Sequence, residues 1–223
     1  MSEKMYAELA LKLECNVGEG PFWDDVKQDL YFVDIMNKQI KMFSPTSKLV
    51  ETVQFNQEIG AVFLDQKSNL IVAARDGIFA ATRDGVLDTL LAPIELEDTS
   101  IRTNDAKCDA YGRMWVGTMA FDFTPGAAAL FSFDSKDLKK VVPDLTVSNG
   151  IGWSLDKKIM YFIDSPTKRV DMFDFDLEGG ELRNRRPFLL LGDLDAFPDG
   201  LTTDEDGGVW VALFGGGEVR RFD

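Results

Sequence analysis

The 223-residue sequence contains no histidine and only two cysteines, Cys15 and Cys108. Without imidazole the chain cannot form a Ser-His-Asp triad, a Cys-His dyad or a histidine-ligated metal site. The two cysteines are far apart and neither has a paired spacing, which excludes a zinc knuckle and a disulfide framework. Any catalysis must therefore depend on carboxylates, amides, lysine, arginine or a metal ion bound through oxygen.

Positive charge and long apolar runs are also scarce. The 24 Lys and Arg residues face 38 Asp and Glu residues, which gives a formal net charge of −14 and disfavours nucleic acid or an anionic membrane as a partner. No segment reaches transmembrane length, and residues 1–5 lack the basic flank and apolar run of a secretory signal. We expect a cytoplasmic monomer with reduced thiols that binds cations or neutral small molecules.

What the sequence does contain is a repeated pattern along its whole length. Each repeat has an apolar strand, a polar turn, a second strand rich in aromatic residues, and a third strand; the repeats start near residues 20, 60, 105, 150 and 200. This spacing of roughly 40–50 residues matches a four-stranded propeller blade. Links such as 65–69 and 204–208 have the Asp, Asn and Gly content of hairpins. The sequence predicts one all-β domain over residues 1–223, with Trp23, Trp115, Trp153 and Trp210 packed between sheets.

The two ends of the chain bear on how such a ring closes. Residues 8–14 alternate in polarity and are predicted to act as a closing strand. The chain stops after the third strand of its fifth repeat, so we expect a propeller of four-stranded antiparallel blades that lacks its last blade. A complete, smaller propeller is the alternative.

Polar residues keep a fixed place just before the first strand of four repeats. They are Glu19, Asn104 with Asp105, Asn149, and Asp199. Taken singly, Asn149-Gly150 and Asp199-Gly200 are common turn sequences. The loops between blades gather at one mouth of the channel, however, and carboxylates facing one another there need a cation between them. Oxygen donors favour calcium, magnesium or manganese over zinc.

Seven segments, in order and in spacing, resemble the family of regucalcin, gluconolactonase and luciferin-regenerating enzyme. They are residues 18–23, 104–109, 117–120, 148–151, 161–165, 184–187 and 198–200. The resemblance runs from about residue 14 to the end of the chain, and it implies a six-bladed propeller.

The resemblance also implies roles for individual residues. Glu19, Asn149 and Asp199 would bind one divalent metal ion, calcium in the first place, with zinc, magnesium and manganese as alternatives. Arg102 and Asn104 would contact the substrate. Asp122 falls at or beside the position of a substrate-binding glutamate, although Phe121 next to it suggests a more apolar ligand than a hexose lactone.

The function that follows is metal-dependent hydrolysis of a small sugar lactone. The ion would polarise the ring carbonyl and activate a water molecule, and Asp199 would act as the general base. Two alternatives stay open. One is a calcium-binding regulatory protein without turnover, and the other is a hydrolase of the luciferin-regenerating or organophosphatase kind.

Overall fold

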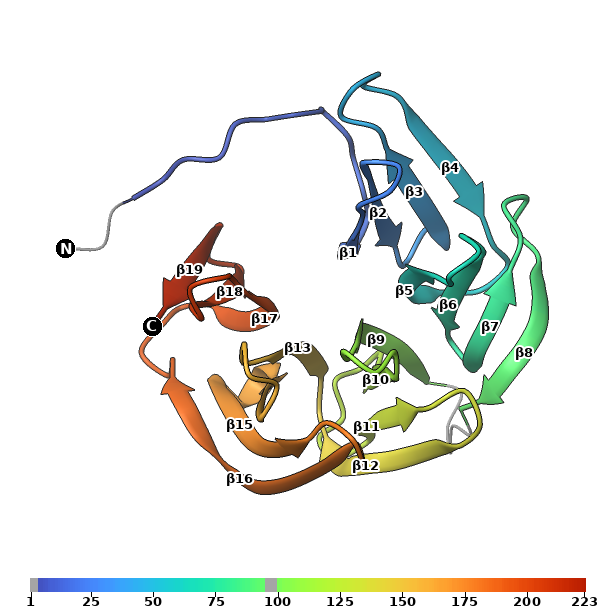
Figure 1. The fold of residues 1–223 in the computed structure, drawn as a ribbon. Helices are drawn as coiled ribbons and strands as arrows, with labels where there is room; N and C mark the ends of the chain where they lie inside the picture. The colour runs from blue at the N-terminus through green and yellow to red at the C-terminus, as the bar shows by residue number, and fades with distance from the viewer. Residues whose placement is uncertain (1–3, 95–99) are drawn as a thin grey trace.

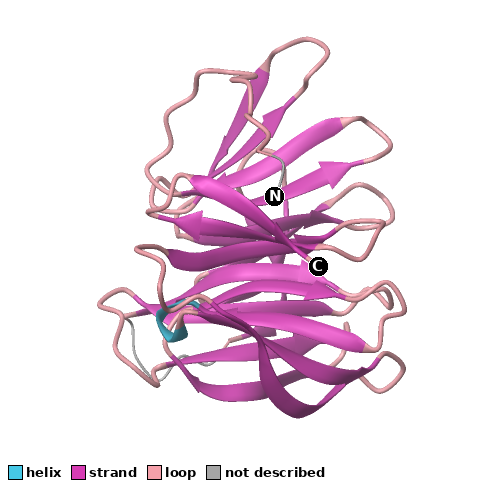
Figure 2. Ribbon diagram, turned by 90° about the vertical axis from the view of Figure 1, so that its left-hand side faces the viewer, coloured by secondary structure: helices cyan, strands magenta, loops and turns pink. Residues whose placement is uncertain are grey.

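A computed structural model of the chain describes residues 4–94 and 100–223. The strands form five antiparallel sheets that surround a common centre as the blades of a propeller (Figure 1). Seen edge-on, neighbouring blades lie face to face (Figure 2). Within each blade, the strands follow one another in space in their order along the chain.

The first blade consists of β1 (Gly18–Asp24), β2 (Asp29–Asp34), β3 (Gln39–Phe43) and β4 (Val50–Gln54). The second consists of β5 (Ile59–Leu64), β6 (Leu70–Ala74), β7 (Gly77–Ala81) and β8 (Leu87–Pro93). The third consists of β9 (Ile101–Cys108), β10 (Met114–Ala120), β11 (Ala128–Phe133) and β12 (Leu138–Leu145). The fourth consists of β13 (Ser148–Trp153), β14 (Ile159–Asp164), β15 (Arg169–Asp176) and β16 (Glu181–Leu190). The fifth has three strands, β17 (Phe197–Thr203), β18 (Val209–Phe214) and β19 (Glu218–Phe222).

The expectation of a six-bladed architecture is wrong, because the structure has five blades and only the last of them has fewer than four strands. The five repeats counted in the sequence correspond one to one to these five sheets. The sixth blade came from the family resemblance and had no strand pattern of its own behind it. Residues 8–14 are not assigned to any strand.

The hairpin between the first two strands of each blade has a recurring geometry. Its last turn residue has a left-handed backbone, at Gln28, Ser68, Gly112, Lys157 and Gly207. In three of the five hairpins an aspartate at the start of the turn accepts hydrogen bonds from the backbone N–H groups two and four residues later. These aspartates are Asp65, Asp109 and Asp204. Such side chains stabilise the tight turn because they replace backbone acceptors.

The hydrophobic core is divided into four clusters, one between each pair of blades that are consecutive along the chain. Strand alternation produces this division, because successive side chains point to opposite faces of a sheet. On β14, for example, Phe162 packs toward the third blade and Ile163 toward the fifth, and both are fully buried. Blades with two apolar faces hold their inner strands in fixed positions around the centre.

The only helical segment in the described part of the chain is the three-residue 3₁₀ turn η1 (Ser165–Thr167). No described helix is long and apolar enough to cross a membrane.

Candidate functional site

All five inner strands interrupt their regular pairing, and in four of them, β1, β9, β13 and β17, the interruption falls where the sequence places its polar residues. The irregularities cover 19–22 in β1, 148–151 in β13 and 198–201 in β17. In β9 the interruption covers Asn104 and Asp105. Glu19, Asn149 and Asp199 therefore lie at strand bulges rather than in turns. A bulge redirects a side chain relative to the sheet.

Glycines beside these bulges let the inner strands approach one another closely. A Cβ atom on Gly150 would lie 2.5 Å from the backbone oxygen of Asp199 and 2.8 Å from the nitrogen of Leu201. A Cβ atom on Gly60 would lie 2.5 Å from the oxygen of Asn104. These contacts are shorter than real Cβ atoms tolerate, so glycine at these positions sets the spacing of the strands that carry the site.

Glu19, Asp105 and Asp199 form an acidic cluster contributed by three blades. Burial, and then the carboxylates of Asp199 and Asp105, raise the pKa of Glu19 to about 8. Burial raises the pKa of Asp199 as well, although hydrogen bonds from Asn149 and Glu19 oppose the rise. Burial also raises the pKa of Asp105 to about 6, with Lys107 opposing and Asp199 adding to the rise. The cluster disfavours full negative charge and would be stabilised by a proton or by a cation.

The amide of Asn149 joins this cluster. Asn149 is buried, its Nδ2 donates to the hydroxyl of Ser165 at 3.0 Å, and its side chain interacts with the Asp199 carboxylate. The three residues predicted as metal ligands therefore come together, although Glu19 and Asp199 belong to the first and fifth blades.

Arg102 and Asn104 form a second, adjoining part of the site. Both are buried, and Arg102 Nη1 donates to Asn104 Oδ1 at 2.9 Å and to the backbone oxygen of Thr103 at 2.8 Å. Burial lowers the pKa of Arg102 to about 10, although the charges of Glu19 and Glu58 oppose this. The Arg102 guanidinium also lies over the Phe121 ring, 5.8 Å from its centre. Arg102 thus keeps its positive charge beside the acidic cluster.

Asp122 does not join these residues. It lies exposed in the loop after β10, and its Oδ1 accepts hydrogen bonds from the backbone N–H and the hydroxyl of Thr124, at 3.0 and 2.7 Å. These hydrogen bonds lower its pKa. In this conformation the carboxylate is committed to its own loop.

The structure adds three residues that the sequence analysis left without a role: Glu58, Asp105 and Lys107. Glu58 comes one position early in its repeat, yet its charge acts on Arg102. Asp105 shares its repeat position with Asn104 and turns out to be part of the acidic cluster. Lys107 follows two residues later on the same strand and interacts with Asp105. Asp105 lies in the bulge of β9, which no local sequence signal specified.

The donor chemistry of the cluster suits a divalent cation. Among the described residues, no group of three or more Asp, Glu and Cys side chains is arranged to hold a metal ion. The predicted set consists instead of two carboxylates and one amide, and the pKa values of both carboxylates are raised by burial. Oxygen ligands of this kind favour hard cations such as calcium and magnesium.

A family model described as SMP-30/Gluconolactonase/LRE-like region matches residues 17–223. The chain is 34% identical over 221 residues to the putative sugar lactone lactonase YvrE of Bacillus subtilis, covering 98% of this chain and 75% of that protein. It is 35% identical over 222 residues to regucalcin of Homo sapiens, covering 97% and 74%. The chain therefore spans about three quarters of the length of these relatives.

Solved structures agree with these matches. A luciferin-regenerating enzyme superposes with a TM-score of 0.86 at 30% identity, covering 94% of this chain and 73% of that one. Regucalcin from Agrobacterium tumefaciens, described as a calcium-binding protein, superposes with a TM-score of 0.91 at 25% identity, covering 96% and 73%.

Proposed function

The chain belongs to the SMP-30/gluconolactonase/LRE-like family, and on that premise we propose that it hydrolyses a small lactone at the cluster of Glu19, Asn149 and Asp199. The observation that carries the proposal is the contact of Asp199 with both Glu19 and Asn149. Relatives named as lactonases support a hydrolase role of this kind.

We propose that Glu19, Asn149 and Asp199 hold one divalent metal ion, calcium in the first place. When bound, the ion would polarise the lactone carbonyl and make a water molecule more acidic. The positive charge of the ion would then offset the repulsion between the carboxylates of Glu19 and Asp199.

The chain's own residues account for the remaining steps. Asp199 lies beside the proposed ion and its carboxylate accepts a proton from water as the water oxygen bonds to the lactone carbon. The carbon–oxygen bond of the ring then breaks, and the proton passes to the departing alkoxide. The products are a free hydroxyl and a carboxylic acid on one molecule, and the acid then releases its proton to solvent.

Arg102 and Asn104 orient the substrate. Arg102 Nη1 already donates to Asn104 Oδ1, which fixes both side chains before a ligand arrives. The remaining guanidinium nitrogens are available to the substrate, and the buried Nε has no partner among the described residues. Prepositioned donors of this kind lower the entropic cost of binding.

The test is an assay of several aldonolactones and simple γ- and δ-lactones, with and without a chelator. We expect turnover that chelator removes and that calcium or manganese restores. Asp199→Asn should lower kcat by about 10²–10⁴-fold, as expected for loss of a general base. Asp206→Asn, in an exposed hairpin, is the matched control and should leave the rate unchanged.

Calcium binding without turnover is the second candidate, favoured by the relatives named regucalcin. Calcium uptake by a chain that hydrolyses no lactone in the panel would support it and exclude the first candidate. Turnover that persists in chelator would contradict the metal-dependent mechanism.

A further inference from the structure

A cavity lined by polar and apolar side chains lies toward the ends of the inner strands that are opposite to the acidic cluster. It has a volume of about 250 Å³ and is lined by the ends of β9, β13 and β17 and by the turn after β13, including Lys107, Cys108, Trp153, Lys157, Thr202 and Thr203. Asn149 and Asp199 stand near the starts of β13 and β17, whereas Trp153 and Thr203 end them. Three or four residues of extended strand separate the two sites by about 10 Å.

The cavity is unusual in this acidic chain because its charged groups are mainly basic. Lys107 and Lys157 both line it, and Lys107 also interacts with the Asp105 carboxylate. Burial raises the pKa of the Cys108 thiol to about 12, so this side chain contributes no negative charge. The one carboxylate in the lining, Asp109, is buried and ion-paired to Arg113 at 2.9 Å.

Asp109 has no acceptor capacity left for a ligand. Its Oδ1 accepts from the backbone N–H groups of Tyr111 and Arg113. Its Oδ2 accepts from Arg113 Nη1 and from the indole N–H of Trp115, at 2.9 and 3.1 Å. Four hydrogen bonds saturate a carboxylate.

The unused groups around the cavity are hydrogen-bond donors. Lys107 Nζ donates to the backbone oxygen of Leu201 at 3.1 Å and to Thr202 Oγ1 at 3.3 Å, which leaves it one N–H. Thr202 Oγ1 receives that bond and keeps its own O–H to donate. Within the part of the chain that the structure describes, Lys157 Nζ has no hydrogen bond or ion pair. Thr203 is already committed, because its hydroxyl donates to the backbone oxygen of Trp153 at 3.0 Å.

We propose that this cavity is a binding site for a small oxyanion, a carboxylate or a phosphate, held by Lys107, Lys157 and Thr202. Two ammonium groups and a hydroxyl match the acceptors of such an anion, and a charge-assisted bond to a partly buried ammonium is stronger than a neutral one. The volume corresponds to about eight water molecules, which is enough for phosphate or a small hydroxy acid.

The proposed anion site uses none of Glu19, Asn149 and Asp199, and Lys107, which also interacts with Asp105, is the residue that adjoins the acidic cluster. Isothermal titration calorimetry with sodium phosphate and with sodium gluconate, at constant ionic strength, tests it directly. We expect saturable binding of at least one of the two anions. Saturation by only one would identify the class of oxyanion, and saturation by neither would overturn the proposal.

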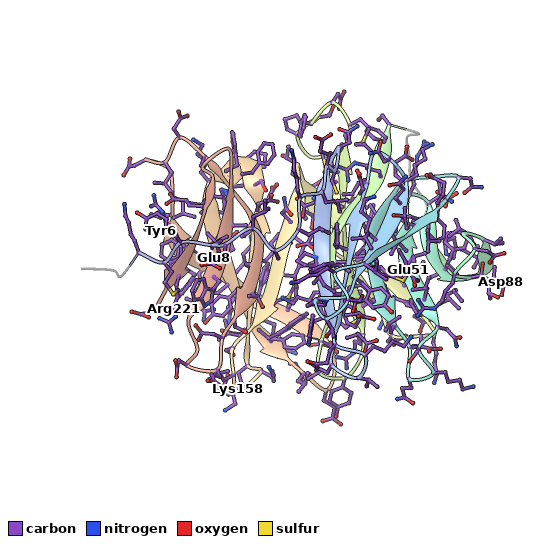
Figure 3. The ribbon with its side chains drawn as sticks, turned by 90° about the horizontal axis from the view of Figure 1, so that it is seen from above. Tyr6, Glu8, Glu51, Asp88, Lys158 and Arg221 are labelled. Carbon is purple, nitrogen blue, oxygen red and sulfur yellow. The ribbon has the colours of Figure 1, made fainter. Side chains whose placement is uncertain are left out.

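Variants locate the binding. Lys157→Gln and Thr202→Val should each weaken binding at least tenfold. The control is Lys158→Gln, because Lys158 is the exposed neighbour in the same turn and is not part of the cavity lining (Figure 3). Lys158→Gln should change the affinity less than twofold. An equal loss of anion affinity in the Lys157 and Lys158 variants would mean that the anion is attracted by surface charge in general, and it would overturn the proposed site.

Discussion

The buried carboxyl groups of Glu19 and Asp199 lie close enough to shift each other's pKa, although these residues stand near the starts of the first and the fifth inner strands. The contact is unfavourable when both groups are ionised, because they are buried and like-charged. The fold itself keeps them together, through four hydrophobic clusters between blades. A cation bound at the proposed site would relieve this repulsion.

The first prediction follows from that contact. Calcium at about 100 times its dissociation constant should stabilise the chain by about 2.7 kcal/mol, which raises the Tm by about 5–10 °C for a chain of this size. Scanning calorimetry with calcium and with chelator measures the shift. Glu19→Gln should abolish most of it, whereas Glu51→Gln, at an exposed position of β4, should keep it. A shift of equal size in both variants would contradict the assigned ligands.

The second prediction separates the two groups of substrate-binding residues proposed from the sequence. Arg102→Lys should raise KM at least tenfold, because lysine cannot reproduce the planar guanidinium that reaches Asn104 Oδ1 and Thr103 O. Asp122→Ala should change KM less than threefold, because its carboxylate is bonded to Thr124. Steady-state kinetics with the best lactone of the panel gives both values. A tenfold rise in KM for Asp122→Ala would show that the loop rearranges to bring Asp122 to the substrate.

The sequence predicted the repeat positions and much of the site because both follow from local patterns. Alternating apolar residues and Asp-rich hairpins specify blades, and a polar residue at a constant place in each blade must converge when the blades surround one centre. Glu19, Asn149 and Asp199 could therefore be grouped from the sequence, and the structure brings them together.

Predictions that depended on side-chain direction were less successful. Trp115 and Trp153 pack edge to face between the third and fourth blades, as predicted, with ring centres 6.2 Å apart. Trp23 is 41% exposed, so the prediction of packing between sheets is wrong for it. Trp115 and Trp210 also donate their indole N–H groups to Asp109 and Asp204, a hydrogen bond that the strand pattern alone does not specify.

The third prediction concerns Asp34, which binds the backbone of the segment just before β1. Its buried carboxylate accepts hydrogen bonds from the backbone N–H groups of Asn16 and Val17 and from Asn37 Nδ2, at 2.8–3.2 Å. Asp34→Ala leaves the backbone donors without this partner and should lower the free energy of unfolding by about 2–4 kcal/mol at pH 7. Urea unfolding measures the loss. Asp25→Ala, at an exposed position in the turn between β1 and β2, should cost less than about 0.5 kcal/mol.

Asp34 also predicts how this stabilisation depends on pH. Burial alone would raise the pKa of Asp34, but the hydrogen bonds from Asn37, Val17 and Asn16 outweigh it and hold the pKa below its usual range. The contribution is therefore complete above the unfolded pKa of about 3.9 and is lost as the pH falls through the lower folded value. The difference between the wild type and Asp34→Ala should shrink below about pH 4. A difference that grows on acidification would contradict the assignment.

The fourth prediction uses two glycines that follow predicted metal ligands in neighbouring blades. A Cβ atom on Gly150 would collide with the backbone of Asp199 and Leu201, whereas a Cβ atom on Gly200 would have no heavy atom within 4 Å. Gly150→Ala must push β13 away from β17, which should cost about 1–3 kcal/mol and lower the Tm by about 2–4 °C for each kcal/mol. The same displacement separates Asn149 from Asp199, so calcium affinity and lactone turnover should fall together. Gly200→Ala should leave the Tm and the affinity nearly unchanged. If the two alanine variants bound calcium equally well, close approach of these strands would not be what assembles the site.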